Sequence, residues 1–151
     1  MSNLTTKTEN YPNGKIRYIH SFKDGNPHGL CQGWYENGMK WCVRHYKNGK
    51  EHGIWQLWYE NGKIKRIYNF KNGKFHGTMQ AFYKNGQRAY RTKHKNGKLS
   101  GLYIVWDKDG DLYNFRYYIH GFDIMNTLIV SVFIILISTI IFIALWVSKV
   151  I

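Results

Sequence analysis

Hydrophobic and polar positions follow two different patterns along the chain, and the change falls at Ile124. Before it, short stretches of alternating apolar and polar residues are separated by Asn-Gly or Asp-Gly pairs, which is typical of antiparallel strands joined by tight turns. From Ile124 to Ser148, 25 residues contain no charged side chain. The first pattern predicts an all-β region over 11–123, and the second predicts a helix over 124–148.

The β region is built from a repeat of 24 residues. Each unit opens with Tyr-x-Asn-Gly and carries Lys-Asn-Gly or Lys-Asp-Gly near its middle; both pairs accept the positive φ of hairpin turns. Two turns per unit leave two strands, so the sequence predicts a single-layer antiparallel β-meander. The units are 11–34, 35–58, 59–82 and 83–106, with a partial fifth at 107–123 and a polar leader at 1–10.

Recurring glycines and aromatic residues are the expected structural positions of this sheet. We expect the glycines to meet backbone requirements, and the aromatic residue that ends each unit to stack on its equivalents in a mostly buried column. The structural positions are Tyr11, Gly14, Gly25, Gly29, Trp34, Tyr35, Gly38, Gly49, Gly53, Trp58, Tyr59, Gly62, Gly73, Gly77, Phe82, Tyr83, Gly86, Gly97, Gly101 and Trp106.

The combined pattern, Tyr-x-Asn-Gly followed by Lys-Asn-Gly-Lys-x-His-Gly, resembles the MORN-repeat family in its longer variant form. This form is similar to repeats in bacterial antitoxin and immunity proteins and in proteins of giant DNA viruses. The resemblance covers residues 11–121 and implies an elongated antiparallel sheet that contacts protein or lipid. The fourth unit departs from the pattern, with Ser100-Gly101 in place of His-Gly.

The apolar run from Leu128 to Val147 is long enough to cross a bilayer, since about 20 helical residues span the hydrocarbon core. A buried core helix is the alternative. Only residues 149–151 follow, and the first ten residues hold no signal peptide. We therefore expect a single-pass, tail-anchored protein with residues 1–123 in the cytosol, because positive charge near a span stays on the cytoplasmic side.

Histidines and cysteines are the candidate chemical groups of the sheet. Successive His-Gly histidines, His28, His52 and His76, should lie two strands or about 10 Å apart, too far to share one metal, so we expect a structural role. Cys31 and Cys42 lie on adjacent strands, on one face or on opposite faces depending on the loop length. A cytosolic location would keep both thiols reduced.

The chain is strongly basic, with 22 Lys+Arg against 9 Asp+Glu. The fourth unit has six basic residues and no acid, so a lipid- or partner-binding site is predicted there. A solvated basic surface is the alternative, and nucleic acid is the least favoured partner. The candidate binding residues are Arg88, Arg91, Lys93, Lys95 and Lys98.

Enzymatic activity is not expected. No nucleophile-and-base motif is present, the repeats leave no segment for a catalytic domain, and no cofactor or metal is predicted. The favoured hypothesis is a membrane-tethered scaffold for protein or lipid contacts, in its most specific version a giant-virus protein of the virion's internal membrane or a host membrane. The alternative is an antitoxin or immunity protein that neutralises a toxin at a membrane.

Overall fold

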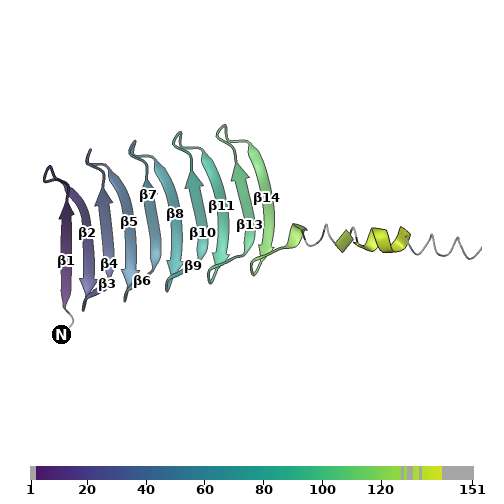
Figure 1. Cartoon of the computed structure of the whole chain (residues 1–151), viewed down its shortest axis with the longest axis horizontal. Coiled ribbons are helices and arrows are strands. Elements are labelled where there is room, and N and C mark those ends of the chain that lie inside the picture. Colours follow the sequence, from purple (N-terminus) through teal and green to yellow (C-terminus); the bar gives the residue numbers. More distant parts are fainter. Residues whose placement is uncertain (1–2, 127, 129–130, 133, 141–151) are drawn as a thin grey trace, which may run out of the picture.

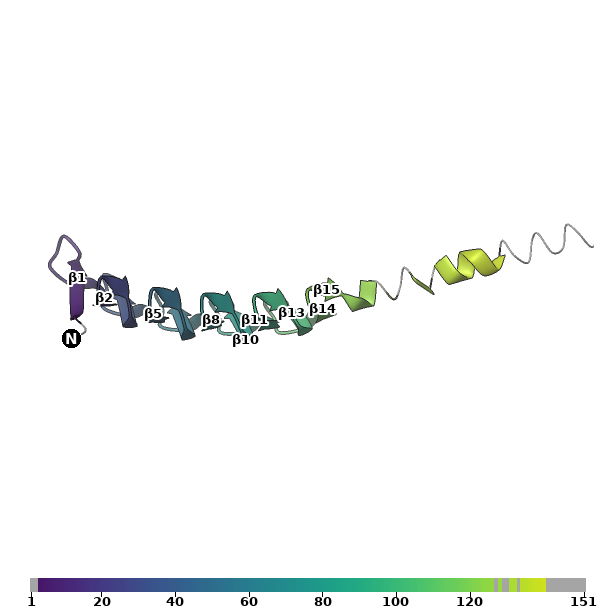
Figure 2. The same cartoon turned by 90° about the horizontal axis from the view of Figure 1, so that it is seen from below.

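The computed structural model describes residues 3–126, 128, 131–132 and 134–140. The strands form one antiparallel sheet in which neighbours in sequence are neighbours in space, and Figures 1 and 2 show them in a single layer along the long axis. The predicted all-β meander is confirmed. Its long hairpins are β1 (Leu4–Asn10) with β2 (Ile16–Lys23), β4 (Gly29–Trp34) with β5 (Lys40–Lys47), β7 (Gly53–Trp58) with β8 (Ile64–Lys71), β10 (Gly77–Phe82) with β11 (Arg88–Lys95), and β13 (Gly101–Trp106) with β14 (Leu112–Ile119).

A two-residue strand follows each hairpin and pairs back onto its second strand. A tight turn thus reverses the chain, which runs for two residues beside the strand it has just left before the next hairpin begins. These short strands are β3 (Asn26–Pro27), β6 (Lys50–Glu51), β9 (Lys74–Phe75), β12 (Lys98–Leu99) and β15 (Phe122–Asp123).

Residues 4–10 of the leader expected at 1–10 are part of the sheet. Leu4 pairs with Lys23 and Glu9 with Tyr18, so β1 is the first strand of the first hairpin. Threonine-rich LTTKTEN favours an extended backbone, but it lacks the aromatic residues and glycines by which the later strands were recognised. Each hairpin therefore consists of the strands on either side of Tyr-x-Asn-Gly.

The two kinds of Asn-Gly turn have different backbones. At the Lys-Asn-Gly turns both central residues are left-handed, as at Asn48 (φ 50°) and Gly49 (φ 76°). At the Tyr-x-Asn-Gly turns only the glycine is left-handed, as at Gly62 (φ 78°). There the asparagine uses its side chain instead: Asn61 Oδ1 accepts a hydrogen bond from Lys63 N–H at 3.2 Å. Positive φ was expected at Asn61 as well, and that expectation is wrong.

Replacing Gly73 by valine is expected to lower the free energy of unfolding by about 1–3 kcal/mol, because a β-branched residue is strained at its φ of 78°. Chemical denaturation measures the change. Lys74→Val is the matched control, since Lys74 is an exposed neighbour in β9 that is not among the positive-φ residues. Equal losses in the two variants would contradict the turn assignment.

Hydrogen bonds between hairpins run along both margins of the sheet. The tyrosine in the turn of each of the first four hairpins donates from its hydroxyl to the carbonyl of the aromatic residue that ends the first long strand of the next hairpin, as from Tyr35 to Trp58 at 2.8 Å and from Tyr59 to Phe82 at 2.8 Å. At the other margin the turn glycines donate from N–H, as from Gly73 to the Glu51 carbonyl at 2.9 Å. These bonds join each hairpin to its neighbour, so we expect stability to be shared between adjacent hairpins.

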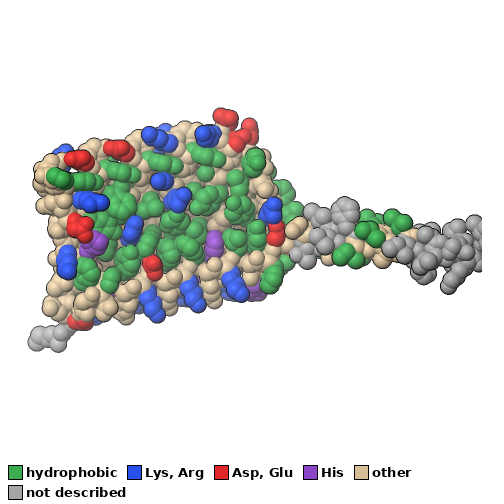
Figure 3. All heavy atoms as spheres, viewed as in Figure 1, with side chains coloured by type: hydrophobic (Ala, Val, Ile, Leu, Met, Phe, Trp, Pro, Cys, Tyr) green, Lys and Arg blue, Asp and Glu red, His purple; other side chains and the backbone are tan. Residues whose placement is uncertain are grey.

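The best-buried side chains lie on one face of the sheet, which we call the aromatic face and which carries Tyr18, Cys31, Cys42, Trp55 and Met79. Tyr18, Cys31, Cys42 and Met79 are buried. Ring contacts extend this cluster along the sheet, with Trp55 4.6 Å from Phe70 between centroids. In Figure 3, hydrophobic side chains run across the sheet from the first hairpin to the last.

The predicted aromatic column is not the core. Trp34, Trp58, Phe82 and Trp106 are only half-buried. The pairing register shifts just before each of them, as between Leu57 and Trp58, so a bulge interrupts the alternation that the prediction extended to the strand end. Their backbone carbonyls serve instead as acceptors for the tyrosine hydroxyls in the turns of the preceding hairpins.

The sheet ends where a glycine is missing. In earlier units a glycine such as Gly101 (φ 98°) turns the chain back beside the preceding strand. The equivalent residue 24 positions later is Met125, and the chain is helical from Ile124. Asp123 caps this helix, because its Oδ1 accepts a hydrogen bond from Asn126 N–H at 3.2 Å while Oδ2 meets Arg116 Nη1 at 2.9 Å.

The transmembrane prediction over 124–148 falls partly outside the described residues. Those described between 124 and 140 are helical, whereas 127, 129–130, 133 and everything from 141 on are not described. Within the described part of the chain, no helix combines the length and the apolar character needed to cross a bilayer.

Candidate functional site

The basic residues predicted as one site in the fourth unit lie in three places. Arg91 and Lys93 share a face of β11, opposite the buried Thr92. Lys95 and Lys98 flank a turn at the margin, where they are opposite each other in the backbone pairing of β11 with β12. The Arg88 guanidinium lies 5.3 Å from the Trp106 ring centroid near the other margin. The fourth unit therefore does not form a single basic patch.

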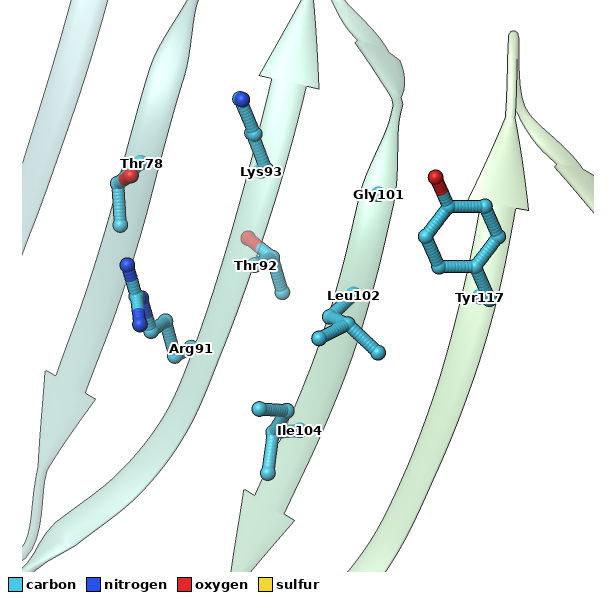
Figure 4. Close-up of a pocket in the computed structure, with 8 residues that line it drawn as sticks. All are labelled: Thr78, Arg91, Thr92, Lys93, Gly101, Leu102, Ile104 and Tyr117. Carbon is cyan, nitrogen blue, oxygen red and sulfur yellow. The ribbon is translucent and has the colours of Figure 1, made fainter.

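Arg91 and Lys93 belong to the second face, which we call the aliphatic face and which also carries Leu30, Ile54 and Leu102. A hollow of about 290 Å³ opens there between β11, β13 and β14. Figure 4 shows Lys93 and Tyr117 on either side of Gly101, which has no side chain to fill the space, with Leu102 below it. This hollow places basic groups beside apolar ones. Such a lining suits a ligand that carries a carboxylate next to an aliphatic group.

A larger basic feature runs along the margin that holds the two-residue strands. Lysine pairs flank successive turns, as Lys47 opposite Lys50 and Lys71 opposite Lys74. Successive pairs are two strands, or about 10 Å, apart. Basic side chains line the lower margin in Figure 3, where β6 and β9 lie in Figure 1. We call this row the lysine edge; it consists of Lys23, Lys47, Lys50, Lys71, Lys74, Lys95 and Lys98.

The two margins differ in charge. The lysine edge holds two acids, Asp24 and Glu51. The opposite margin, formed by the five Tyr-x-Asn-Gly-type turns, carries more acids than lysines. It comprises Glu36, Glu60, Asp107, Asp109 and Asp111 with Lys15, Lys63, Lys84 and Lys108. Because Arg88 also lies near the opposite margin, the charge there is close to balanced, and an anionic surface would be attracted more strongly to the lysine edge.

Hollows between successive turns of the lysine edge are lined by lysine and asparagine side chains. One of about 410 Å³ is lined by Lys50, Lys71, Asn72, Lys74 and Asn96, which come from three successive turns. Ammonium groups from two units can reach one phosphate or carboxylate there, and such charge-assisted bonds are the stronger ones. Sequence reasoning missed this edge because it counted charge per unit. The detectable signal was the lysine on both sides of Asn-Gly.

Cys31 and Cys42 lie on the same face and are diagonal neighbours, because Cys31 pairs with Arg44 and Cys42 with Gly33. Both are free thiols and both are buried. Burial raises the pKa of the Cys42 thiol and of the Tyr18 hydroxyl, so both stay protonated at neutral pH. The Arg44 guanidinium lies 5.2 Å from the Trp41 ring centroid. A protonated, buried thiol is a poor nucleophile, so this cluster is structural.

The His-Gly histidines form hydrogen bonds with backbone groups next to the start of a hairpin. The N–H of His52 donates to the carbonyl of His45 at 3.0 Å, and that of His76 donates to Asn69 at 2.8 Å. His28 Nδ1 accepts from Asn48 N–H at 3.3 Å. Over the part of the chain that the structure describes, no three His, Cys, Asp or Glu side chains are grouped to hold a metal ion.

A family model described as a MORN repeat variant matches residues 6–24, 27–48, 51–72 and 75–96. No curated protein matches the chain. Each matched segment covers the two long strands of one hairpin, or nearly so, and not a unit beginning at the tyrosine. Since the four segments span more than half of the residues, the protein belongs to the family of MORN repeat variants.

Proposed function

We propose that the protein is a non-enzymatic interaction scaffold tethered to a membrane by the apolar segment 124–148. The observation that carries this proposal is the exposure of the helix after the sheet, where Ile134, Ile137 and Ile140 are 55–65% exposed. Apolar surface of this kind marks a membrane or protein contact. The absence of charge over 124–148 favours the membrane.

The junction supports a sheet held close to the membrane. Asp123 joins β15 to the helix and binds Arg116 of β14, so capping and an ion pair fix the point where the helix leaves. The basic sheet next to the span favours the cytosolic side for residues 1–123, with a single pass through the bilayer.

A protein is the proposed partner of the aliphatic face. Leu30, Ile54 and Leu102 are exposed on it, and Arg91 and Lys93 add positive charge beside them. Repeats of this family commonly mediate protein or membrane interactions. No described feature of the sheet favours the virion or the antitoxin hypothesis, and neither is part of this proposal.

The anchor is tested by placing charge in it. Ile134→Lys with Ile137→Lys is expected to move the full chain from the carbonate-resistant membrane fraction to the supernatant, because each lysine at the centre of a span costs about 2.5–3.5 kcal/mol. Fractionation of membranes from expressing cells measures this. The control is Ile54→Lys with Leu102→Lys, which adds the same charge at exposed aliphatic positions of the sheet.

The side of the membrane on which residues 1–123 lie is measured with the same membranes. Protease added to intact vesicles is expected to digest the repeats, because residues 1–123 face the cytosol in this proposal. The membrane tether would be contradicted if carbonate extracted the wild-type chain. It would also be contradicted if the control variant were released as readily as the anchor variant. Protected repeats would contradict the orientation alone.

A further inference from the structure

We propose that the free edge of β1 pairs with β1 of a second copy of this chain, so that two sheets join end to end into one. β1 is the terminal strand of the sheet, and among the described residues its strand partner is β2 alone. All seven of its residues are exposed. An edge strand of this kind presents main-chain donors and acceptors on which another strand can add.

The outward main-chain groups of β1 belong to alternate residues. Thr6 lies opposite Ser21 of β2, whose carbonyl accepts a hydrogen bond from His28 N–H on its other side. Because pairs in an antiparallel ladder alternate between bonded and non-bonded, the N–H and C=O groups of Thr6 and Thr8 point away from β2, and those of Lys7 point towards it. Two copies can therefore bond only in registers that pair outward residues with one another.

Charge selects one of these registers. A two-fold axis at Thr8 places Lys7 of each copy opposite Glu9 of the other, in the non-bonded pairs where facing side chains are closest. An axis at Lys7 would set two lysines against each other, which destabilises a sheet. An axis at Thr6 would give neither charge an opposite partner. The spacing of the two charges is thus self-complementary, and this favours a second copy over an unrelated strand.

Both charged side chains already lie on one face of the sheet, the aromatic face. Glu9 Oε1 is 3.2 Å from His20 Nε2, and Lys7 Nζ is 5.6 Å from the Phe22 ring centroid. The Glu9 side chain is 58% exposed, so its carboxylate can accept from a second cation. The contact with a second copy therefore adds to these local contacts and does not replace them.

The opposite end of the sheet is closed to a further strand. The chain is helical from Ile124, and Met125 stands where an earlier hairpin has Gly101, so the helix takes the place of the next strand beside β14. Figure 1 shows this helix leaving along the long axis of the sheet. Copies therefore cannot add head to tail, and two-fold pairing through β1 stops at a dimer.

The two helices leave the joined sheet from its opposite ends and point away from each other. At about 4.8 Å per strand, the five hairpins of one copy extend over about 50 Å, so the helices of the dimer start about 100 Å apart. A dimer of this shape suits two membranes that face each other better than one membrane. This arrangement rests on the proposed tether, whereas the pairing of the β1 strands does not.

The pairing is tested with the full chain in detergent, by sedimentation equilibrium. The wild type is expected to form a reversible dimer. Lys7→Glu alone and Glu9→Lys alone each place like charges opposite one another in both pairs, and each should raise the dimer dissociation constant about tenfold or more. An equimolar mixture of the two variants should form a heterodimer, because an all-acidic strand then faces an all-basic one. A monomeric wild type, single variants that dimerise like the wild type, or a mixture without heterodimer would each overturn the proposal.

Matched variants assign the effect to the β1 edge. Lys84→Glu and Glu60→Lys make the same charge changes at exposed positions in turns of other hairpins, and both should dimerise like the wild type. Thr8→Pro removes an outward N–H and no bond to β2, which an edge strand tolerates, so the dimer should be lost while circular dichroism still shows the sheet. A folded Thr8→Pro dimer would contradict main-chain pairing. The charge mixture decides the question if this variant does not fold.

Phosphatidylcholine vesicles that carry the full chain with its sheet outside test the bridging arrangement. Wild-type vesicles are expected to cluster, and light scattering measures this. Vesicles that carry Lys7→Glu should cluster with vesicles that carry Glu9→Lys and not with one another. A dimer in detergent without clustering would overturn the bridge alone. Carbonate extraction of the same vesicles shows whether the tether has failed instead, because the dimer in detergent does not depend on it.

Discussion

Replacing Trp55 by alanine is expected to lower the free energy of unfolding by about 3–5 kcal/mol, the largest effect of any single truncation that we predict for the sheet. The Trp55 ring lies 5.2 Å from Tyr46 and 4.6 Å from Phe70 between centroids. The Arg44 guanidinium lies 5.1 Å from it, and its indole N–H donates to the His45 carbonyl at 2.9 Å. The truncation removes all four contacts and breaks the ring cluster in the middle of the sheet.

Two comparisons make this prediction specific. Trp58→Ala should cost clearly less, because that side chain lies beyond the bulge at the end of β7 and no ring contact is found for it among the described residues. Tyr113→Ala, at a position 77% exposed, should change stability by about 0.5 kcal/mol or less. Denaturant unfolding of the three variants gives the order. A greater loss at Trp58 than at Trp55 would place the core on the wrong face.

Replacing Gly33 by valine is expected to cost about 3 kcal/mol, at the upper end of overpacking effects. A Cβ on Gly33 would lie 2.3 Å from Trp41 Nε1 and 2.7 Å from Tyr18 Cδ2, so both rings would have to move. Gly33 is not one of the positive-φ glycines, so the loss comes from contact and not from backbone strain.

A double-mutant cycle separates the causes. Trp41→Ala should destabilise by itself, but adding it to Gly33→Val should recover part of the loss, because the closest clash is removed. Circular dichroism melts of the wild type, the two single variants and the double variant provide the coupling. Additive losses would show that Trp41 does not fill the space above Gly33.

The sequence by itself determined the repeat, the positions of the turns and the antiparallel meander. Asn48-Gly49 and its equivalents reveal two-residue turns because left-handed backbone is a local requirement that few residues meet. Alternation between such turns then fixes strands, and short loops leave consecutive strands no arrangement other than neighbouring pairs.

The tertiary structure alone decided what depends on neighbours across strands. The bulge before Trp58 leaves the predicted column only half-buried, and the buried core lies instead at residues such as Cys42 and Met79 of the aromatic face. β1 was found only through its pairing with β2. The Tyr59 hydroxyl reaches Phe82, 23 residues away, and the lysine edge assembles from turns 24 residues apart. Contacts of this kind exist only after the strands have paired in register, because pairing is what brings residues of different hairpins to within bonding distance.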